Sequence, residues 1–187
     1  MITRISNTDL LDILKDEKNY PNFGLHAEKG KMLLGNTGNW KTTIINEYLD
    51  WKWINPITVS KRFGHRLTHE EIIEDSYRSK GSLDDYYLLI DELGANEQSA
   101  IVEYGNVKHP VKSLIKRRYD NWLKAKNGIR PLESVDAGYN YFVSNYNLEQ
   151  LTNIFGKEVV SRFYDLCDII IVDGQDSRIL NYNNESR

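Results

Sequence analysis

Short apolar runs alternate with amphipathic segments along the sequence, and this alternation predicts an α/β protein. The apolar runs have the length and composition of buried parallel strands. They lie at residues 31–34, 56–59, 86–90, 139–143 and 168–172. Apolar residues between these runs recur at helical spacing. This spacing predicts helices at residues 41–50, 110–126, 148–154 and 157–167. Strands that alternate with helices are typical of a parallel sheet covered by helices.

Three further segments are predicted to be helical. A helix is expected over residues 8–18, a second over residues 68–78 behind the capping box T-H-E-E, and a short third one around residues 99–103. His65 and His69 are four residues apart, a spacing that can place two metal ligands on one helical face. No third ligand of this kind is near them, so we favour a solvated start of the helix.

Composition limits the possible classes of protein. The length of 187 residues fits a single domain, and the 40% of hydrophobic residues and 27% of charged residues are ordinary for a soluble protein. No apolar run is long enough to span a membrane, and the acidic N-terminus lacks the features of a signal peptide. The lone Cys167 excludes an intrachain disulfide, and the net charge of −3 argues against a uniformly basic surface. We therefore expect a cytoplasmic protein that does not bind membranes.

The stretch G-N-T-G-N-W-K-T-T resembles the phosphate-binding pattern G-x-x-x-x-G-K-[ST]. Gly35, Lys41 and Thr42 occupy the required positions, whereas Trp40 stands where the pattern has its second glycine. Backbone N–H groups of such a loop, followed by a helix N-terminus, form an anion site. The stretch predicts ATP binding, with Thr42 as a ligand of Mg²⁺. The predicted nucleotide-binding residues are Gly35, Asn36, Thr37, Gly38, Asn39, Trp40, Lys41, Thr42 and Thr43.

Two later strands end in polar residues suited to the same chemistry. Asp91 and Glu92 follow the apolar run at residues 86–90, which is the arrangement of a Walker B motif. We assign Asp91 to the metal and Glu92 to the general base that polarises the attacking water. Asn145 follows the run at residues 139–143 and is expected to reach the γ-phosphate or that water. An acidic turn after a strand without a catalytic role is the simpler alternative.

The helix predicted at residues 110–126 is rich in basic residues. Lys112, Lys116, Arg117 and Arg118 could contact nucleic-acid phosphates, and Trp122 accompanies them. A solvated helix face explains the same pattern equally well.

Taken together, these motifs resemble the AAA+ ATPases of the DnaC and DnaI helicase-loader type and the related IstB transposition ATPases. The likeness covers roughly residues 23–178. Its most specific parts are L-L-I-D-E-L-G at 88–94, V-S-N-Y-N-L-E-Q-L at 143–151 and F-G-K-E-V-V-S-R-F at 155–163.

This resemblance implies a P-loop NTPase fold of the AAA+ type, with a five-stranded parallel sheet of order 5-1-4-3-2 flanked by helices and no separate lid domain. Residues 1–22 would form a short helical arm, residues 23–178 the ATPase domain and residues 179–187 a polar tail. Asn145 would be sensor 1. Arg162 would be the arginine finger that acts on ATP bound to a neighbouring copy.

The implied function is ATP hydrolysis in DNA replication, as a helicase loader, or in transposition. The implied partners are further copies of the chain, single-stranded DNA, and a replicative helicase or a transposase. Two alternatives remain open. Trp40 favours a nucleotide-incompetent scaffold that binds a protein or DNA partner, and a small-molecule P-loop kinase would share the phosphate loop but would not explain Arg162 or Asn145.

Overall fold

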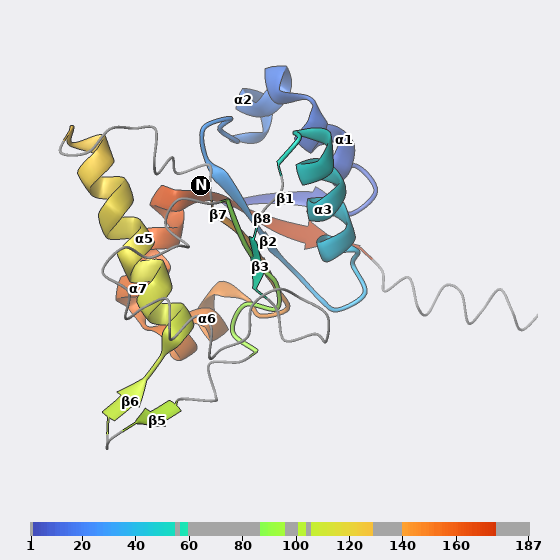
Figure 1. The fold of residues 1–187 in the computed structure, drawn as a ribbon. Helices are drawn as coiled ribbons and strands as arrows, with labels where there is room; N and C mark the ends of the chain where they lie inside the picture. Colours follow the sequence, from blue (N-terminus) through green and yellow to red (C-terminus); the bar gives the residue numbers. More distant parts are fainter. Residues whose placement is uncertain are drawn as a thin grey trace, which may run out of the picture.

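A parallel β-sheet forms the centre of the molecule (Figure 1). The computed structural model describes residues 2–54, 57–59, 87–95, 101–103, 106–128 and 140–174. In these ranges, the 6-stranded sheet has the order β1-β8-β2-β7-β4-β3, with every neighbouring pair parallel. The strands are β1 (Ile2–Ser6), β2 (Gly30–Leu34), β3 (Ile57–Val59), β4 (Leu88–Ile90), β7 (Asn140–Ser144) and β8 (Cys167–Asp173).

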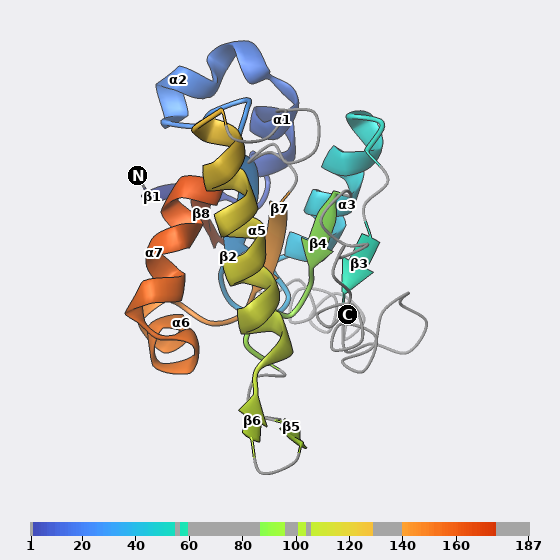
Figure 2. The ribbon, with the colours of Figure 1, turned by 60° about the vertical axis from the view of Figure 1, so that its left-hand side comes forward.

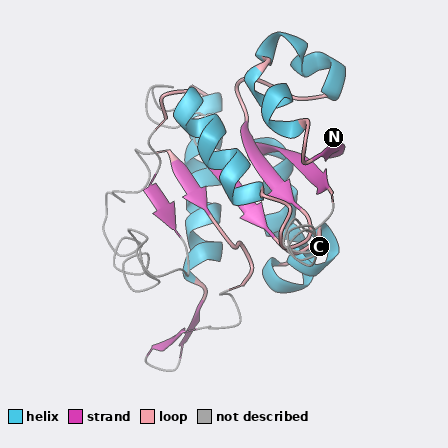
Figure 3. Cartoon of the chain, turned by 90° about the vertical axis from the view of Figure 1, so that its right-hand side faces the viewer, coloured by secondary structure: helices cyan, strands magenta, loops and turns pink. Residues whose placement is uncertain are grey.

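Helices cover both faces of this sheet (Figure 3). One face carries α1 (Leu10–Lys15), α2 (Tyr20–Phe23) and α3 (Lys41–Trp51), with the 3-10 turn η1 (Glu17–Asn19) between the first two. The other face carries α5 (Pro110–Lys126), α6 (Leu148–Phe155) and α7 (Lys157–Leu166). A small antiparallel hairpin of β5 (Ile101–Glu103) and β6 (Asn106–Lys108) projects beyond the start of α5 (Figure 2).

The alternation of side chains along each strand divides the core into two layers. Successive side chains of a strand point to opposite faces of a sheet. In β2, Met32 and Leu34 pack in the layer under α5, α6 and α7, whereas Leu33 packs in the layer under α1, α2 and α3. In β7, Phe142 packs in the layer under α5, α6 and α7, and Tyr141 packs in the layer under α1, α2 and α3. Burial on both faces explains why these strands are apolar throughout in the sequence.

The strand order predicted from the sequence is confirmed. The predicted strands 5-1-4-3-2 correspond to β8-β2-β7-β4-β3 in the sheet. An additional strand, β1, pairs with β8 and extends this order at one edge. Ile5 is the buried hydrophobic residue of β1, so the segment has no apolar run that would predict a strand. Among the described helices, none combines the length and apolar character needed to cross a membrane.

One predicted helix is wrong. The segment around residues 99–103 contributes β5 to the hairpin instead of a helix. Ile101 and Val102 are β-branched, and such residues favour extended backbone over helix. The helix predicted over residues 68–78, with His65 and His69, and the tail at residues 179–187 lie outside the described residues.

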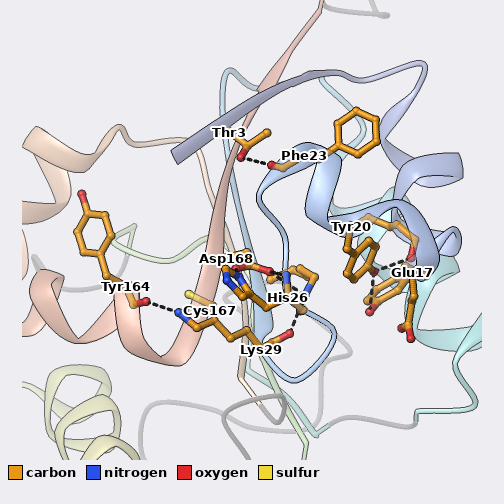
Figure 4. Close-up of polar contacts among 12 residues, drawn as sticks. Thr3, Glu17, Tyr20, Phe23, His26, Lys29, Tyr164, Cys167 and Asp168 are labelled. Carbon is orange, nitrogen blue, oxygen red and sulfur yellow. Dashed lines mark hydrogen bonds and ion pairs between the residues drawn. The ribbon is translucent and has the colours of Figure 1, made fainter. Parts of the chain in front are cut away.

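A buried ion pair closes the amino-terminal end of β2 and β8. Lys31 and Asp168 are neighbours in the strand register, and the Lys31 Nζ lies 3.1 Å from Asp168 Oδ2. The Lys31 side chain is 0% exposed and that of Asp168 is 5% exposed. The backbone N–H and the Nδ1 of His26 both contact the Asp168 carboxylate at 2.7 Å (Figure 4). The pair therefore fixes the segment before β2 against the end of the sheet opposite the loop at residues 35–40.

Candidate functional site

The loop between β2 and α3 begins at a position that admits only glycine. Gly35 has a φ of +152°, and a Cβ at this position would lie 2.6 Å from the carbonyl oxygen of Val172 in β8. Its N–H donates to the Ser144 carbonyl oxygen in β7 at 3.3 Å. The first glycine of the phosphate-binding pattern thus lets the loop leave the sheet tightly between two strands.

Trp40 has a backbone conformation that favours glycine. Its φ of 57° and ψ of 13° lie in the left-handed region, directly before the first residue of α3. This conformation costs a residue with a Cβ about 1–2 kcal/mol. The residue is 53% exposed, so the indole does not fill the interior of the loop. Trp40 therefore carries backbone strain directly before the first residue of α3.

Lys41 is the central cation of the loop. Its Nζ donates to the carbonyl oxygens of Gly35 (2.9 Å) and Asn36 (2.7 Å) and to Oδ1 of Asn145 (2.9 Å). Burial lowers the pKa of Lys41 to about 8, although the charge of Asp91 acts in the opposite direction. The ammonium group is therefore mostly protonated at pH 7 and joins the loop to the end of β7.

Thr42 and Asp91 form a pair of oxygen ligands beside this lysine. Thr42 Oγ1 donates to Asp91 Oδ1 at 3.0 Å, and the Glu92 N–H donates to the same carboxylate oxygen at 3.0 Å. Asp91 is 3% exposed. Hydroxyl and carboxylate oxygens are ligands that Mg²⁺ takes together with substrate phosphates and water. Among the described residues, no group of three or more His, Cys, Asp or Glu could hold a metal alone. The pair therefore fits an ion that is shared with a phosphate ligand.

These side chains meet around one open cavity of about 230 Å³. Glu92 reaches its rim from a turn with a φ of 56°, another strained position. The cavity is lined by Thr37, Gly38, Asn39, Trp40, Lys41, Thr42, Thr43, Asp91, Glu92, Val143, Ser144 and Asn145. Gly35 and Asn36 line a neighbouring cavity of about 440 Å³, which shares Asn39 and Asn145 with the first. The structure thus brings the predicted loop, acidic and asparagine residues together at the carboxyl ends of β2, β4 and β7.

Ser144 is a member of this site that sequence reasoning did not assign. Its Oγ donates to the Leu93 carbonyl oxygen at 2.7 Å and accepts from the Tyr146 N–H at 3.0 Å. It therefore fixes the turn that carries Glu92 against the end of β7. A serine directly before Asn145, at the end of an apolar strand, was the signal that could have identified it.

Arg162 lies away from this cavity, on α7. Its Nη2 contacts Glu158 Oε1 at 2.9 Å, and its guanidinium carbon lies 4.9 Å from the centre of the Tyr119 ring. The side chain is 16% exposed. To act on a nucleotide of another copy, the guanidinium would have to leave these partners, and the arginine-finger role stays a prediction.

Arg118 does not fit its predicted contact with nucleic acid. It is 1% exposed, and its Nε donates to Asn140 Oδ1 in the core. The reason is helical spacing, because Arg118 follows the buried Leu114 by four residues. Lys112, Lys116 and Arg117 are partly exposed on the same helix.

The fold and the site together define a class of protein. A parallel sheet of this order, a glycine loop between a central strand and a helix, and a carboxylate at the end of β4 together make up a P-loop fold.

Comparisons with known proteins concern the fold. No family model and no curated protein matches the sequence. Among solved structures, the chain is similar to the DnaC helicase loader, with 17% identity, 89% of each chain covered and a TM-score of 0.48. It is also similar to AMPPCP-bound DnaA from Aquifex aeolicus, with 14% identity and a TM-score of 0.49. That match covers 97% of this chain and 52% of the DnaA chain, so the chain spans about half of its length.

Proposed function

We propose that the chain binds ATP with Mg²⁺ and hydrolyses it. The observation that carries this proposal is the convergence of Lys41, the Thr42–Asp91 pair and Asn145 on one cavity. A cation, an oxygen pair for a metal and an amide from three different strand ends are the groups that phosphoryl transfer requires.

Each residue would have a distinct part in this reaction. Lys41 would exchange the carbonyl oxygens of Gly35 and Asn36 for oxygens of the β- and γ-phosphates. Thr42 and Asp91 would hold Mg²⁺, which neutralises charge on the phosphates when it is bound. Glu92 would polarise the attacking water, and Asn145 would orient the γ-phosphate or that water.

Two substitutions separate binding from hydrolysis. Lys41→Ala is expected to abolish ATP binding, measured by calorimetry, because it removes the only cation that lines the cavity within the described residues. Glu92→Gln is expected to keep ATP binding but to lower the hydrolysis rate by about 100-fold or more, since general bases typically contribute factors of this size. Equal hydrolysis rates for the wild type and Glu92→Gln would remove the catalytic assignment.

The sequence motifs lead us to place this ATPase in DNA replication, as a helicase loader, or in transposition. In this proposal, copies of the chain assemble on single-stranded DNA and contact a replicative helicase or a transposase, and Arg162 completes the ATP site of a neighbour. The test is the ATPase rate with and without single-stranded DNA, for the wild type and Arg162→Ala. A rate that depends on neither DNA nor Arg162 would argue against this role.

A specific observation also favours the scaffold alternative. Trp40 is strained and lines the cavity, and the Lys41 ammonium is already bonded to carbonyl oxygens of its own loop. If the chain is a scaffold, ATP binding should be undetectable in the wild type and should appear in Trp40→Gly. Tight binding by the wild type would exclude this alternative.

A further inference from the structure

Helices α5 and α7 lie side by side (Figure 2), and one exposed carboxylate joins them. Glu158, in the first turn of α7, is 63% exposed. Its Oε2 accepts from Lys116 Nζ on α5 at 2.9 Å, and its Oε1 accepts from Arg162 Nη2 at 2.9 Å. A Cβ placed on Gly156 would lie 3.9 Å from Lys112 Nζ, so a third cation lies beside the start of α7.

These cations outnumber the carboxylate that they surround. Lys116 chiefly, followed by Arg162 and Lys112, holds the pKa of the Glu158 carboxyl below its usual range. The single negative charge of Glu158 cannot neutralise three positive charges. Positive charge therefore prevails around Glu158, whereas Asp120 and Asp165 bring negative charge to Tyr119.

Glu158 also leaves part of the Arg162 guanidinium unused. Nη2 donates to Glu158, whereas the buried Nη1 has no hydrogen-bond partner within the described part of the chain. A guanidinium presents its N–H groups as a fork that matches a phosphate or carboxylate with two accepting oxygens. The bond to Glu158 uses Nη2, and the buried Nη1 would become available to a second anionic oxygen only if the side chain moved.

The basic residues continue as a stripe along α5. Lys112, Lys116, Tyr119, Leu123 and Lys126 follow one another at spacings of three or four residues and so share one side of the helix. The stripe is about 21 Å long, at 1.5 Å per residue. Lys126 Nζ lies 4.8 Å from the ring centre of Trp122, and the Tyr119 and Trp122 rings are 5.5 Å apart.

This arrangement suits an extended polyanion with planar bases better than a small ligand. None of these residues lines either of the two cavities described above. Cations in series with aromatic rings between them are typical of surfaces that bind single-stranded nucleic acid. Asp120 and Asp165 are negative charges close to Tyr119. They repel phosphates from that part of the stripe, so the phosphate contacts are confined to the half around Lys112 and Lys116.

We propose that the α5–α7 rim, formed by Lys112, Lys116, Tyr119 and Arg162, binds a single-stranded nucleic acid, with the three cations as the phosphate contacts. Glu158 occupies the position of a phosphate in the free protein and competes with the strand. This inference deepens the DNA-associated part of the proposed function, and it does not depend on ATP hydrolysis. It assigns Arg162 to a nucleic acid bound by its own chain, as an alternative to the arginine-finger role, and it replaces the buried Arg118 in the predicted set of phosphate contacts.

The test compares a variant that removes a negative charge with one that removes a positive charge, both in the absence of nucleotide. Binding of a fluorescent single-stranded dT oligonucleotide is measured by anisotropy at several salt concentrations. Glu158→Gln should tighten binding about threefold to fivefold, a typical size for one exposed charge interaction. Its dependence on salt should steepen because one more phosphate is neutralised. Lys116→Gln should weaken binding by a similar factor. Glu47→Gln, an exposed carboxylate on α3 at the other face of the sheet, is the matched control and should leave binding unchanged.

Each other outcome has a distinct meaning. No binding of the oligonucleotide by the wild type would overturn both the inference and the DNA-associated role. Binding by the wild type that responds to Glu158→Gln no more than to Glu47→Gln would overturn the inference alone. If a poly-glutamate peptide competed with the oligonucleotide as well as unlabelled oligonucleotide does, the partner would be an acidic protein segment. That result would also overturn the inference. Far-UV circular dichroism of each variant verifies the fold.

Discussion

Replacing Trp40 tests whether its backbone conformation costs stability. Ala and Gly both remove the indole, but only Gly relieves the left-handed conformation at a φ of 57°. That conformation costs a residue with a Cβ about 1–2 kcal/mol, whereas the greater freedom of Gly in the unfolded chain costs about 0.5–1 kcal/mol. We therefore expect Trp40→Gly to unfold with a free energy about 1 kcal/mol higher than that of Trp40→Ala.

The assay is unfolding in urea, followed by far-UV circular dichroism because the substitutions remove a tryptophan. With a slope of about 2 kcal/mol per molar urea, the midpoint of Trp40→Gly should lie about 0.5 M above that of Trp40→Ala. The matched control is Glu47 in α3, an exposed position inside the helix. There the order should reverse, with Ala about 1 kcal/mol more stable than Gly. The same order at both positions would refute the strain argument.

Three further predictions concern other parts of the site and the sheet. Asp168→Asn should lower the free energy of unfolding by about 3–5 kcal/mol in the same assay, because it leaves the charge of buried Lys31 without its partner. Lys31→Met in the Asp168→Asn background should recover much of this loss, and no recovery would contradict the explanation. The affinity for ATP should fall as the pH rises through 8, because the Lys41 ammonium has a pKa of about 8 and is neutral above it. Calorimetry from pH 6.5 to 9.5 checks this, and the affinity of Lys41→Arg for ATP should depend less on pH. Gly35→Ala should destabilise the chain more than Gly128→Ala, by roughly 1–3 kcal/mol. A Cβ at Gly35 would lie 2.6 Å from a backbone atom, whereas a Cβ at Gly128 would have nothing within 4 Å. Equal midpoints of unfolding in urea would show that the loop adapts.

The parts of the fold that could be predicted from the sequence share a physical cause. Strands buried on both faces are continuous apolar runs, and polar residues at their carboxyl ends are conspicuous against that background. Asp91 and Asn145 could therefore be placed at one edge of the sheet before their contacts were known. Lys41 could be placed as well, because its helix starts directly after the glycine loop.

The features that escaped prediction depend on contacts between distant segments. Strand β1 buries one hydrophobic side chain and is held by pairing with β8, which no local pattern reveals. The Lys31–Asp168 pair joins residues that become neighbours only in the assembled sheet. The burial of Arg118 follows from which side of α5 faces the core, and a count of basic residues along the helix does not use that information.

The position of β2 in the sheet has a consequence for the order of synthesis. This strand carries the phosphate loop, yet both of its neighbours, β7 and β8, come from the last quarter of the chain. A ribosome therefore releases Lys41 and its loop long before the strands that hold them exist. Contacts between residues so far apart in sequence form slowly and leave apolar segments exposed during folding. The phosphate loop is among the earlier segments to be synthesised and must be among the last to reach its final form.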